Sequence, residues 1–530
     1  MTTLAKWTAA TLAAAGLALG ASGALAQGNT LQVARVIDAD RYDPPRTTAR
    51  SAGDIVFLIA DTLVALDWDL TTLKPLLAKS WSVTPDGKTY TFNLRDDVKF
   101  CDGRGMVADD VVYSLKRWID PDLKSPVRGR AGKVKEIRAK DKYTVEYELD
   151  EPYGELLFQL TQYFSSIVDR NSVEKLGADF GVKGFNGTGP YCWESWVPRQ
   201  EFALKRNPHY TWGPDIYKNR GPAQIERMVW KIIPEDSTRL AAIQTNQVHI
   251  TQYVPYIAMS QAMKAPNLKV ETAQSYLWTW YIGFKVDRDL VSDLKVRQAM
   301  NLAVDREALA KNVWFGHAVP AYTPVSPDTP DFNKETLGAQ LKFDPDRAKK
   351  LLDEAGWKVG ADGFRHKDGK KLAPVFYGIS GSPTRQMVEA VQGDLRKVGV
   401  DMQVNLFDAT IAWGKLATQE FDTYAMSYPY VSVGDAYNLY FRSAAAPTPN
   451  RMNWKNPRTD ELLAKGSAAL TVEERRKYFD EAQMQIQQAA VWIPIIHEQL
   501  FLTATNRLDG VRAHGIYGCG IYKGLDFKWK

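Results

Sequence analysis

Residue patterns that could carry catalysis occur in this sequence only as fragments. Ser172-Val-Glu-Lys175 and Ser292-Asp-Leu-Lys295 both fit the S-x-x-K pattern of nucleophilic serines, but neither an S-D-N nor a K-T-G segment accompanies them. Gly378-Ile-Ser380-Gly381-Ser382 misses the G-x-S-x-G nucleophile elbow by one position. The residues give no positive support for an enzyme, and a secreted hydrolase built from distant residues stays as an alternative.

Cofactor and metal motifs are also incomplete. Gly129-Arg-Ala-Gly132-Lys133 is too short for a phosphate-binding loop, and no Ser or Thr follows its lysine. Gly518, Gly520 and Gly524 miss the spacing of a dinucleotide-binding turn. The six histidines are far apart, and no two of them have the i, i+4 spacing of a helical metal pair. We therefore expect no cofactor and no metal ion.

The 530-residue chain has the composition of an ordinary globular protein, with 45% hydrophobic and 24% charged residues. Its 67 Lys and Arg against 62 Asp and Glu leave a net charge of +5, which is too small to indicate a nucleic-acid-binding surface. Residues 124–142 hold eight of these cations, but no aromatic side chain interleaves them, which favours a solvated face. Sixteen Trp, 24 Tyr and 20 Phe suit a large recognition cleft.

The N-terminus predicts export. Lys6 supplies a positive start, residues 8–19 are small and apolar, and Ala24-Leu25-Ala26 fits the cleavage rule of a secretory signal peptide over residues 1–26. The apolar run is too short to span a bilayer, and the next candidate, residues 55–70, is interrupted by three aspartates. We expect the mature chain to begin at Gln27 and to be exported.

Strand and helix patterns alternate along the remainder. Residues 88–94 and 142–149 alternate in polarity like half-buried strands, and residues 108–118 have the i, i+4, i+7 apolar spacing of a helix. Further helices are predicted over 296–311, 345–355, 382–398 and 472–489. No repeat of fixed period occurs, so the pattern indicates several α/β domains rather than a solenoid or propeller.

Several segments together resemble the family 5 solute-binding proteins of bacterial ABC importers. The strongest is residues 75–117, PLLAKSWSVTPDGKTYTFNLRDDVKFCDGRGMVADDVVYSLKR, followed by TGPYCWESWVPRQEFALKRNPHYTWG over residues 188–213. Similar segments over residues 234–250, 296–309, 343–357 and 494–497 follow in the family's order. Each segment alone could be explained by the packing of a core. The order of the segments over the whole mature chain is what makes the resemblance specific for this family.

This resemblance implies a two-lobed α/β periplasmic-binding-protein fold with hinge-type crossovers. Lobe I would comprise residues 27–72, 190–273 and 495–530, the inserted domain residues 73–189, and lobe II residues 274–494. A solute held between the lobes would favour the closed form, which an inner-membrane ABC permease recognises. The implied protein is a monomeric receptor for a di- or oligopeptide-like solute. A non-peptide solute, such as an opine or an oligosaccharide, is the alternative.

The same resemblance places Cys192 and Cys519 in lobe I and Cys101 in the inserted domain. A Cys192–Cys519 disulfide would tie the C-terminal segment to its lobe. Three buried thiols are the competing interpretation, since an odd number leaves at least one cysteine unpaired.

In peptide-binding members of the family, an aspartate in a loop of lobe II holds the α-ammonium group of the ligand. The matching region here is residues 421–441, where that position falls on Val431 or, with a shift of one residue, on Ser432. Neither is acidic, and Asp435 is the nearest carboxylate, so it either takes over the ammonium role or caps local amides. We expect weak binding of a free peptide N-terminus unless Asp435 reaches the ligand.

Aromatic residues provide the other candidate ligand contacts. Tyr276, Trp278 and Trp280 alternate along the crossover segment and are predicted to share one face, either of the cleft or of a core. Arg46 is a candidate partner for a ligand carboxylate, with a solvated loop position as its alternative. The remaining candidates, carried over from family positions or from the loop that follows, are Trp413, Tyr428 and Tyr430.

Overall fold

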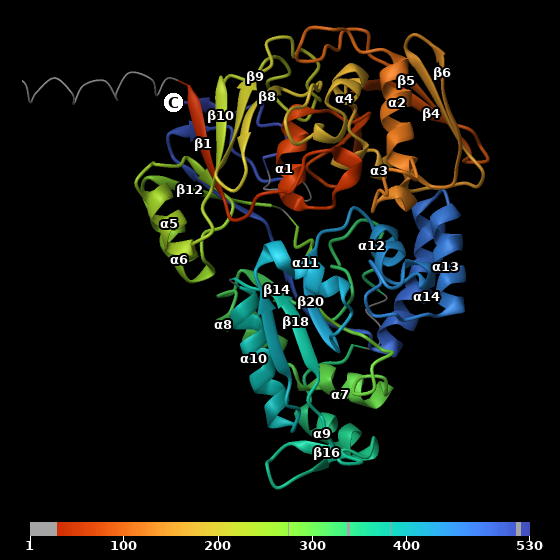
Figure 1. Ribbon diagram of the computed structural model, residues 1–530, viewed down its shortest axis with the longest axis vertical. Coiled ribbons are helices and arrows are strands. Elements are labelled where there is room, and N and C mark those ends of the chain that lie inside the picture. Colours follow the sequence, from red (N-terminus) through yellow and green to blue (C-terminus); the bar gives the residue numbers. More distant parts are fainter. Residues whose placement is uncertain (1–28, 274, 336–339, 382, 516–520) are drawn as a thin grey trace, which may run out of the picture.

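Two large β-sheets divide the molecule into an upper and a lower half in the computed structural model (Figure 1). The structure describes residues 29–273, 275–335, 340–381, 383–515 and 521–530. The proposed signal peptide lies outside these residues. Within the described chain, no helix combines the length and the apolar character that crossing a membrane requires.

The first lobe is built on a seven-stranded mixed sheet. In spatial order its strands are β12 (Leu268–Thr272), β22 (Phe501–Thr505), β11 (Ile250–Thr251), β1 (Thr30–Arg35), β10 (Arg227–Ile232), β9 (Glu201–Arg206) and β8 (Tyr191–Val197). β1 pairs in parallel with both β10 and β11, whereas β8, β9 and β10 form an antiparallel meander. Helices α1 (Arg50–Ile59), α5 (Asp236–Gln244) and α6 (Tyr256–Lys264) belong to this lobe.

A four-stranded antiparallel sheet lies beside the first lobe, in the upper right of Figure 1. Its order is β4 (Ala78–Val83), β5 (Thr89–Leu94), β7 (Thr144–Leu149) and β6 (Val134–Asp141). In β5, alternate side chains are buried, and helix α2 (Ala108–Ile119) packs Val111, Leu115 and Trp118 inward, as their spacing predicts. One continuous apolar cluster joins this sheet to the first lobe, which makes the two parts one packed unit.

The second lobe, the lower half of Figure 1, is built on a six-stranded sheet. Its order is β14 (Ala318–Pro320), β21 (Trp492–Glu498), β13 (Trp278–Phe284), β20 (Thr423–Tyr428), β18 (Val375–Ile379) and β19 (Gln403–Phe407). Its helices are α7 (Leu294–Ala303), α8 (Arg306–Asn312), α9 (Pro345–Glu354), α10 (Thr384–Lys397), α11 (Ala409–Ala417), α12 (Val433–Tyr440), α13 (Pro457–Ala468) and α14 (Val472–Ala489). A second apolar core fills the space between this sheet and α7, α9 and α10.

The chain passes between the two large sheets twice. It leaves β12 of the first lobe and enters β13 of the second, and it returns from β21 to β22. β21 pairs with β13 and β14 up to Glu498, so the return falls at residues 499–500, a few residues after the expected boundary at residue 495. β13 and β21 are neighbours in the lower sheet, and the two crossovers therefore leave it side by side.

One predicted helix is divided in two. The expected helix over residues 296–311 is interrupted at Val304, and α8 starts anew with Asp305 as its N-cap. The Asp305 carboxylate accepts a hydrogen bond from the backbone N–H of Ala308 at 2.9 Å, which satisfies a donor that a new helix start exposes.

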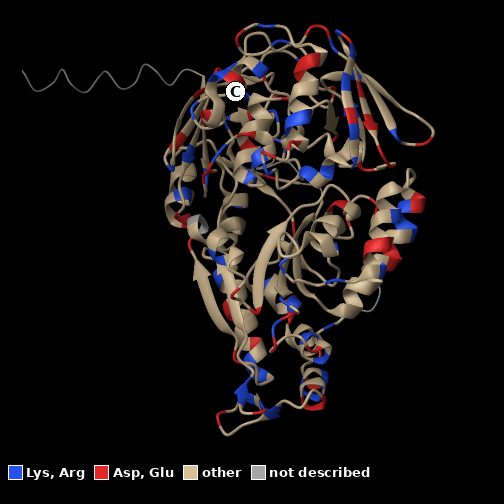
Figure 2. Cartoon of the chain, turned by 45° about the vertical axis from the view of Figure 1, so that its right-hand side comes forward, with Lys and Arg blue, Asp and Glu red and all other residues tan. Residues whose placement is uncertain are grey.

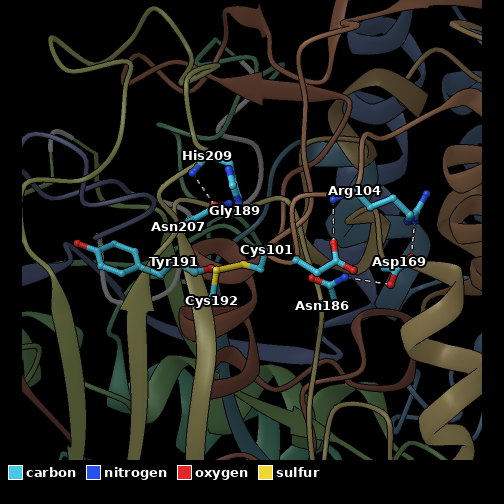
Figure 3. The surroundings of a disulfide bond; sticks show 10 residues. Cys101, Arg104, Asp169, Asn186, Gly189, Tyr191, Cys192, Asn207 and His209 are labelled. Atoms are coloured by element: carbon cyan, nitrogen blue, oxygen red, sulfur yellow. Dashed lines mark hydrogen bonds and ion pairs between the residues drawn. A yellow bond between two sulfur atoms is a disulfide. The ribbon is translucent and has the colours of Figure 1, made fainter.

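The predicted Cys192–Cys519 disulfide is wrong. Cys192, at the start of β8, is bonded to Cys101, and the Cα atoms of the pair lie 5.8 Å apart (Figure 3). Cys519 lies outside the described residues. The backbone N–H of Cys101 also donates to the carbonyl of Gly187, just before β8, at 3.0 Å. The bond ties the inserted four-stranded domain to the first lobe.

Candidate ligand-binding site between the lobes

The end of β20, the loop after it and the first turn of α12 together carry four of the expected site residues. Tyr428 ends β20, and Tyr430, whose ring lies 5.5 Å from that of Tyr428, is fully buried in the loop. Ser432 is the N-cap of α12, with its Oγ accepting from the backbone N–H of Asp435 at 2.9 Å. This cap fixes the serine and the aspartate on the first turn of α12, which faces the inserted domain.

Asp435 forms an ion pair with a residue of the opposite half of the molecule. The Nη2 atom of Arg130 lies 2.7 Å from Asp435 Oδ1, and both side chains are at least nine-tenths buried. Gln159 Nε2 donates to the same carboxylate at 3.3 Å. Both partners come from the inserted domain, so the carboxylate joins the two lobes.

Arg130 is held by rings as well as by charge. It lies in a single 3-10 turn, η2 (Arg128–Ala131), and its guanidinium carbon is 5.2 Å from the Phe164 ring and 5.9 Å from the Tyr428 ring. Burial alone would lower its pKa, but the charge of Asp435 outweighs this and raises the pKa of Arg130. Arg130 is therefore a fixed cation of the interface.

Glu155 is the second acid of the interface. It is 1% exposed, and the Ser432 hydroxyl donates to its Oε1 at 2.7 Å. Burial, reinforced by the charges of Asp435 and Asp331 and opposed by the Ser432 hydrogen bond and by Arg475, raises the pKa of Glu155 to about 8. The group is consequently protonated at neutral pH.

Several polar atoms around this cluster are buried without a hydrogen-bond partner in the described part of the chain. They are Glu155 Oε2, Gln159 Oε1, the Tyr430 hydroxyl, and Nε and Nη2 of Arg130, although Nη2 lies within ion-pair distance of Asp435. Buried polar atoms are normally paired, so these atoms are open to a ligand or to ordered water. The arrangement can bind a polar solute.

A second group of contacts joins the lobes beside the crossovers. The Arg50 guanidinium is sandwiched between the rings of Tyr253, at 4.7 Å, and Trp278, at 4.9 Å. The buried carboxyl of Glu498, at the end of β21, accepts hydrogen bonds from the hydroxyl of Tyr256 in α6 and from the indole N–H of Trp280. Burial raises the pKa of Glu498. These contacts lie where a change in the angle between the lobes would break them.

The expected face of three aligned rings does not form. β13 starts only at Trp278, so Tyr276 precedes the strand, where its backbone N–H donates to Asp328 at 3.1 Å. Trp278 packs into the core of the first lobe, while Trp280 packs against Trp314 in the second lobe at 5.9 Å. Both tryptophans border the crossovers, but each one belongs to a different core.

Two other candidates lie apart from the Asp435 cluster. Trp413, on α11, is 49% exposed, and the Arg451 guanidinium lies 5.5 Å from its ring. Arg46 ends the short 3-10 helix Pro44–Arg46, and it forms no ion pair with any acidic residue that the structure describes.

Sequence reasoning missed Arg130, Glu155 and Gln159. Arg130 lies within the basic segment 124–142, which the sequence predicts to be a solvated face. That interpretation fits β6, whose Lys135 and Arg138 are exposed and form surface ion pairs, but it is wrong for Arg130. The small neighbours Gly129, Ala131 and Gly132, which permit a tight turn, are the one local signal in the sequence.

Two surface pockets lie within single lobes and include none of the interface residues. One in the second lobe is lined by Arg306 and Trp492 among others, and one in the first lobe by His249 and Trp529 among others. The chemistry of the interface, with charged groups contributed by both halves, makes it the stronger candidate site. In the described part of the chain, no three His, Cys, Asp or Glu side chains are arranged to hold a metal ion.

Comparisons with known proteins match this architecture. The family model described as "Bacterial extracellular solute-binding proteins, family 5 Middle" matches residues 72–449. The oligopeptide-binding protein AppA of Bacillus subtilis is 26% identical over 513 residues, covering 92% of this chain and 90% of AppA. The glutathione-binding protein GsiB of Salmonella paratyphi A is 27% identical over 481 residues, covering 89% of each chain.

Solved structures share the fold. AppA in complex with a nonapeptide superposes with a TM-score of 0.85 at 23% identity, covering 94% of this chain and 99% of AppA. AgaA of A. tumefaciens R10 in complex with agropinic acid superposes with a TM-score of 0.81 at 22% identity, covering 94% of this chain and 99% of AgaA.

Proposed function

The chain belongs to family 5 of the bacterial extracellular solute-binding proteins, and from this premise we propose which solute it captures and where. It is the substrate-binding subunit of an ABC importer, a receptor rather than an enzyme. We propose that residues 1–26 direct export to the periplasm and that the mature monomer holds a peptide-like solute between its two lobes.

The observation that carries this proposal is the buried polar cluster at the interface. Asp435 and Ser432 come from the second lobe, whereas Arg130 and Glu155 come from the inserted domain. A solute that contacts both sides is bound more tightly by the closed form and shifts the population toward it. The relatives named for oligopeptides and for glutathione support a ligand with peptide bonds.

A non-peptide solute is the second candidate. Asp435 is already neutralised by Arg130, which leaves no net negative charge for a free peptide N-terminus. The structural neighbour AgaA, in complex with agropinic acid, supports a solute of the opine type within the same fold.

Titration calorimetry on ligand-free protein separates the two candidates. Protein unfolded in urea, dialysed and refolded is titrated with a panel of di- to pentapeptides, N-acetylated peptides, opines and oligosaccharides, while small-angle scattering follows closure. We expect binding of a peptide or an acylated peptide together with a decrease in the radius of gyration. Binding of an opine or a sugar alone would replace the peptide proposal by the second candidate.

A further inference from the structure

Asp435 has a cation of its own across the interface, and we propose that Arg130 therefore sets the ligand class of the subsite. The Asp435–Arg130 subsite accepts a neutral hydrogen-bonding group, such as an amide or a hydroxyl, and rejects an ammonium group. This inference rests on the proposed function, because it concerns which part of the captured solute meets the loop between β20 and α12.

Charge balance is the first argument. The Arg130 guanidinium and the Asp435 carboxylate lie 2.7 Å apart, and both are almost completely buried. A buried carboxylate needs one counter-ion, and a second cation brought by the ligand would be desolvated beside Arg130 with nothing left to neutralise it. Arg130 thus neutralises Asp435 within the chain, so that no cationic group of the ligand is needed to do so.

The immobility of Arg130 is the second argument. Its guanidinium lies between Phe164 of the inserted domain and Tyr428 of the second lobe, and its side chain is at least nine-tenths buried. Moving aside for an ammonium group would expose the rings and leave the guanidinium without its carboxylate. Arg130 acts on the ligand through charge and space.

The neighbouring open atoms are the third argument. Glu155 Oε2, Gln159 Oε1 and the Tyr430 hydroxyl are buried and lack partners in the described part of the chain. The same holds, the ion pair with Asp435 aside, for Nε and Nη2 of Arg130, which can donate to a carbonyl or hydroxyl oxygen of a solute. A protonated carboxyl, an amide oxygen and a phenol are neutral donors or acceptors, and they match amide and hydroxyl groups of a solute. The raised pKa of Glu155 is consistent with a subsite that carries no net charge.

Titration calorimetry on variants that lack one or both charges of the pair tests the selectivity between an ammonium and an acylated N-terminus. The probes are trialanine and N-acetyl-trialanine, and the proteins are the wild type, Arg130→Gln, Arg130→Gln/Asp435→Asn and the control Arg128→Gln, whose exposed side chain lies in the same turn. We expect the wild type and Arg128→Gln to favour the acetylated probe at least tenfold. Arg130→Gln should shift the ratio at least tenfold toward free trialanine, and Asp435→Asn should cancel that shift. A purely structural Arg130 would weaken both probes equally, and an unchanged ratio would overturn the proposal.

Chemical rescue tests the same cation site without any peptide. Methylguanidinium at millimolar concentration should raise the melting temperature of Arg130→Ala by several degrees, but not that of the wild type or of Arg130→Ala/Asp435→Asn. In the mirror experiment, acetate should stabilise Asp435→Asn, which keeps an unpaired guanidinium. If neither tripeptide binds any of the proteins, the peptide proposal fails. The rescue experiment still shows whether Arg130 is the cation that neutralises Asp435. Absence of rescue in both variants would contradict the inference.

Discussion

The Cys101–Cys192 bond makes a quantitative prediction about how the inserted domain is attached. Its cysteines are 91 residues apart in the sequence, so the bond closes residues 101–192, which include α2, β6 and β7 of the inserted domain, into a loop. The loss of chain entropy in the unfolded state for a loop of this length is worth ~4–5 kcal/mol. Replacing both cysteines by serine should lower the free energy of unfolding by about that amount, since the hydrogen bonds around the site remain (Figure 3).

Urea unfolding followed by circular dichroism measures this difference, with reduced wild type as the matched control. Thiol titration of the wild type in denaturant without reductant gives the independent readout. We expect one reactive thiol, since the chain has three cysteines and two are bonded. Cys519→Ser should abolish the remaining signal. Three reactive thiols, or a double serine variant as stable as the oxidised wild type, would refute the reasoning.

Three further substitutions test the interface and the separate candidate Trp413. The free energy of unfolding of the wild type should fall as the pH rises from 4.5 to 8, because Glu155, whose pKa is raised from 4.5 to about 8, keeps its proton in the folded protein and loses it on unfolding. Glu155→Gln should remove this fall. At ~1.4 kcal/mol per pKa unit, the fall is up to about 5 kcal/mol. Urea unfolding at several pH values measures it. If the free energy of unfolding of Glu155→Gln still fell over this pH range, Glu155 would be excluded as the source. Gly434→Ala should weaken solute binding in calorimetry, because its new Cβ would lie 2.1 Å from Glu155 Oε1; undiminished affinity would show that the lobes need not approach so closely. Trp413→Ala should cost ~2 kcal/mol, about thirtyfold in Kd, if its half-exposed ring anchors the solute, and unchanged affinity would remove it from the site.

The sequence predicts the local elements well, because their signals are local. The alternation over residues 88–94 and the apolar spacing over 108–118 correspond to β5 and α2 with boundaries shifted by a residue or so. The break before Asp305 was missed because an aspartate suits both a helix interior and an N-cap, and only the partner N–H distinguishes them.

The partners within the site could not be predicted, because they depend on contacts between distant segments. Arg130 and Asp435 are separated by more than three hundred residues, and the small neighbours of Arg130 indicate a tight turn but do not show which residue the arginine meets. Likewise, Cys192 pairs with Cys101 because a loop of the inserted domain reaches β8. The alternation of Trp278 and Trp280 is present, but the strand begins at the crossover, and the two rings enter the cores of different lobes.

Native mass spectrometry of the protein as purified from the periplasm tests the proposed capture of a peptide-like solute most directly. The chain should carry one small molecule, released by urea, whose fragment ions are spaced by amino-acid residues and whose amine is blocked or absent. Its loss from Arg130→Ala, but not from Arg128→Gln, would place it at the interface. A bound molecule without peptide bonds, or one retained equally by both variants, would contradict the peptide assignment or the position of the site.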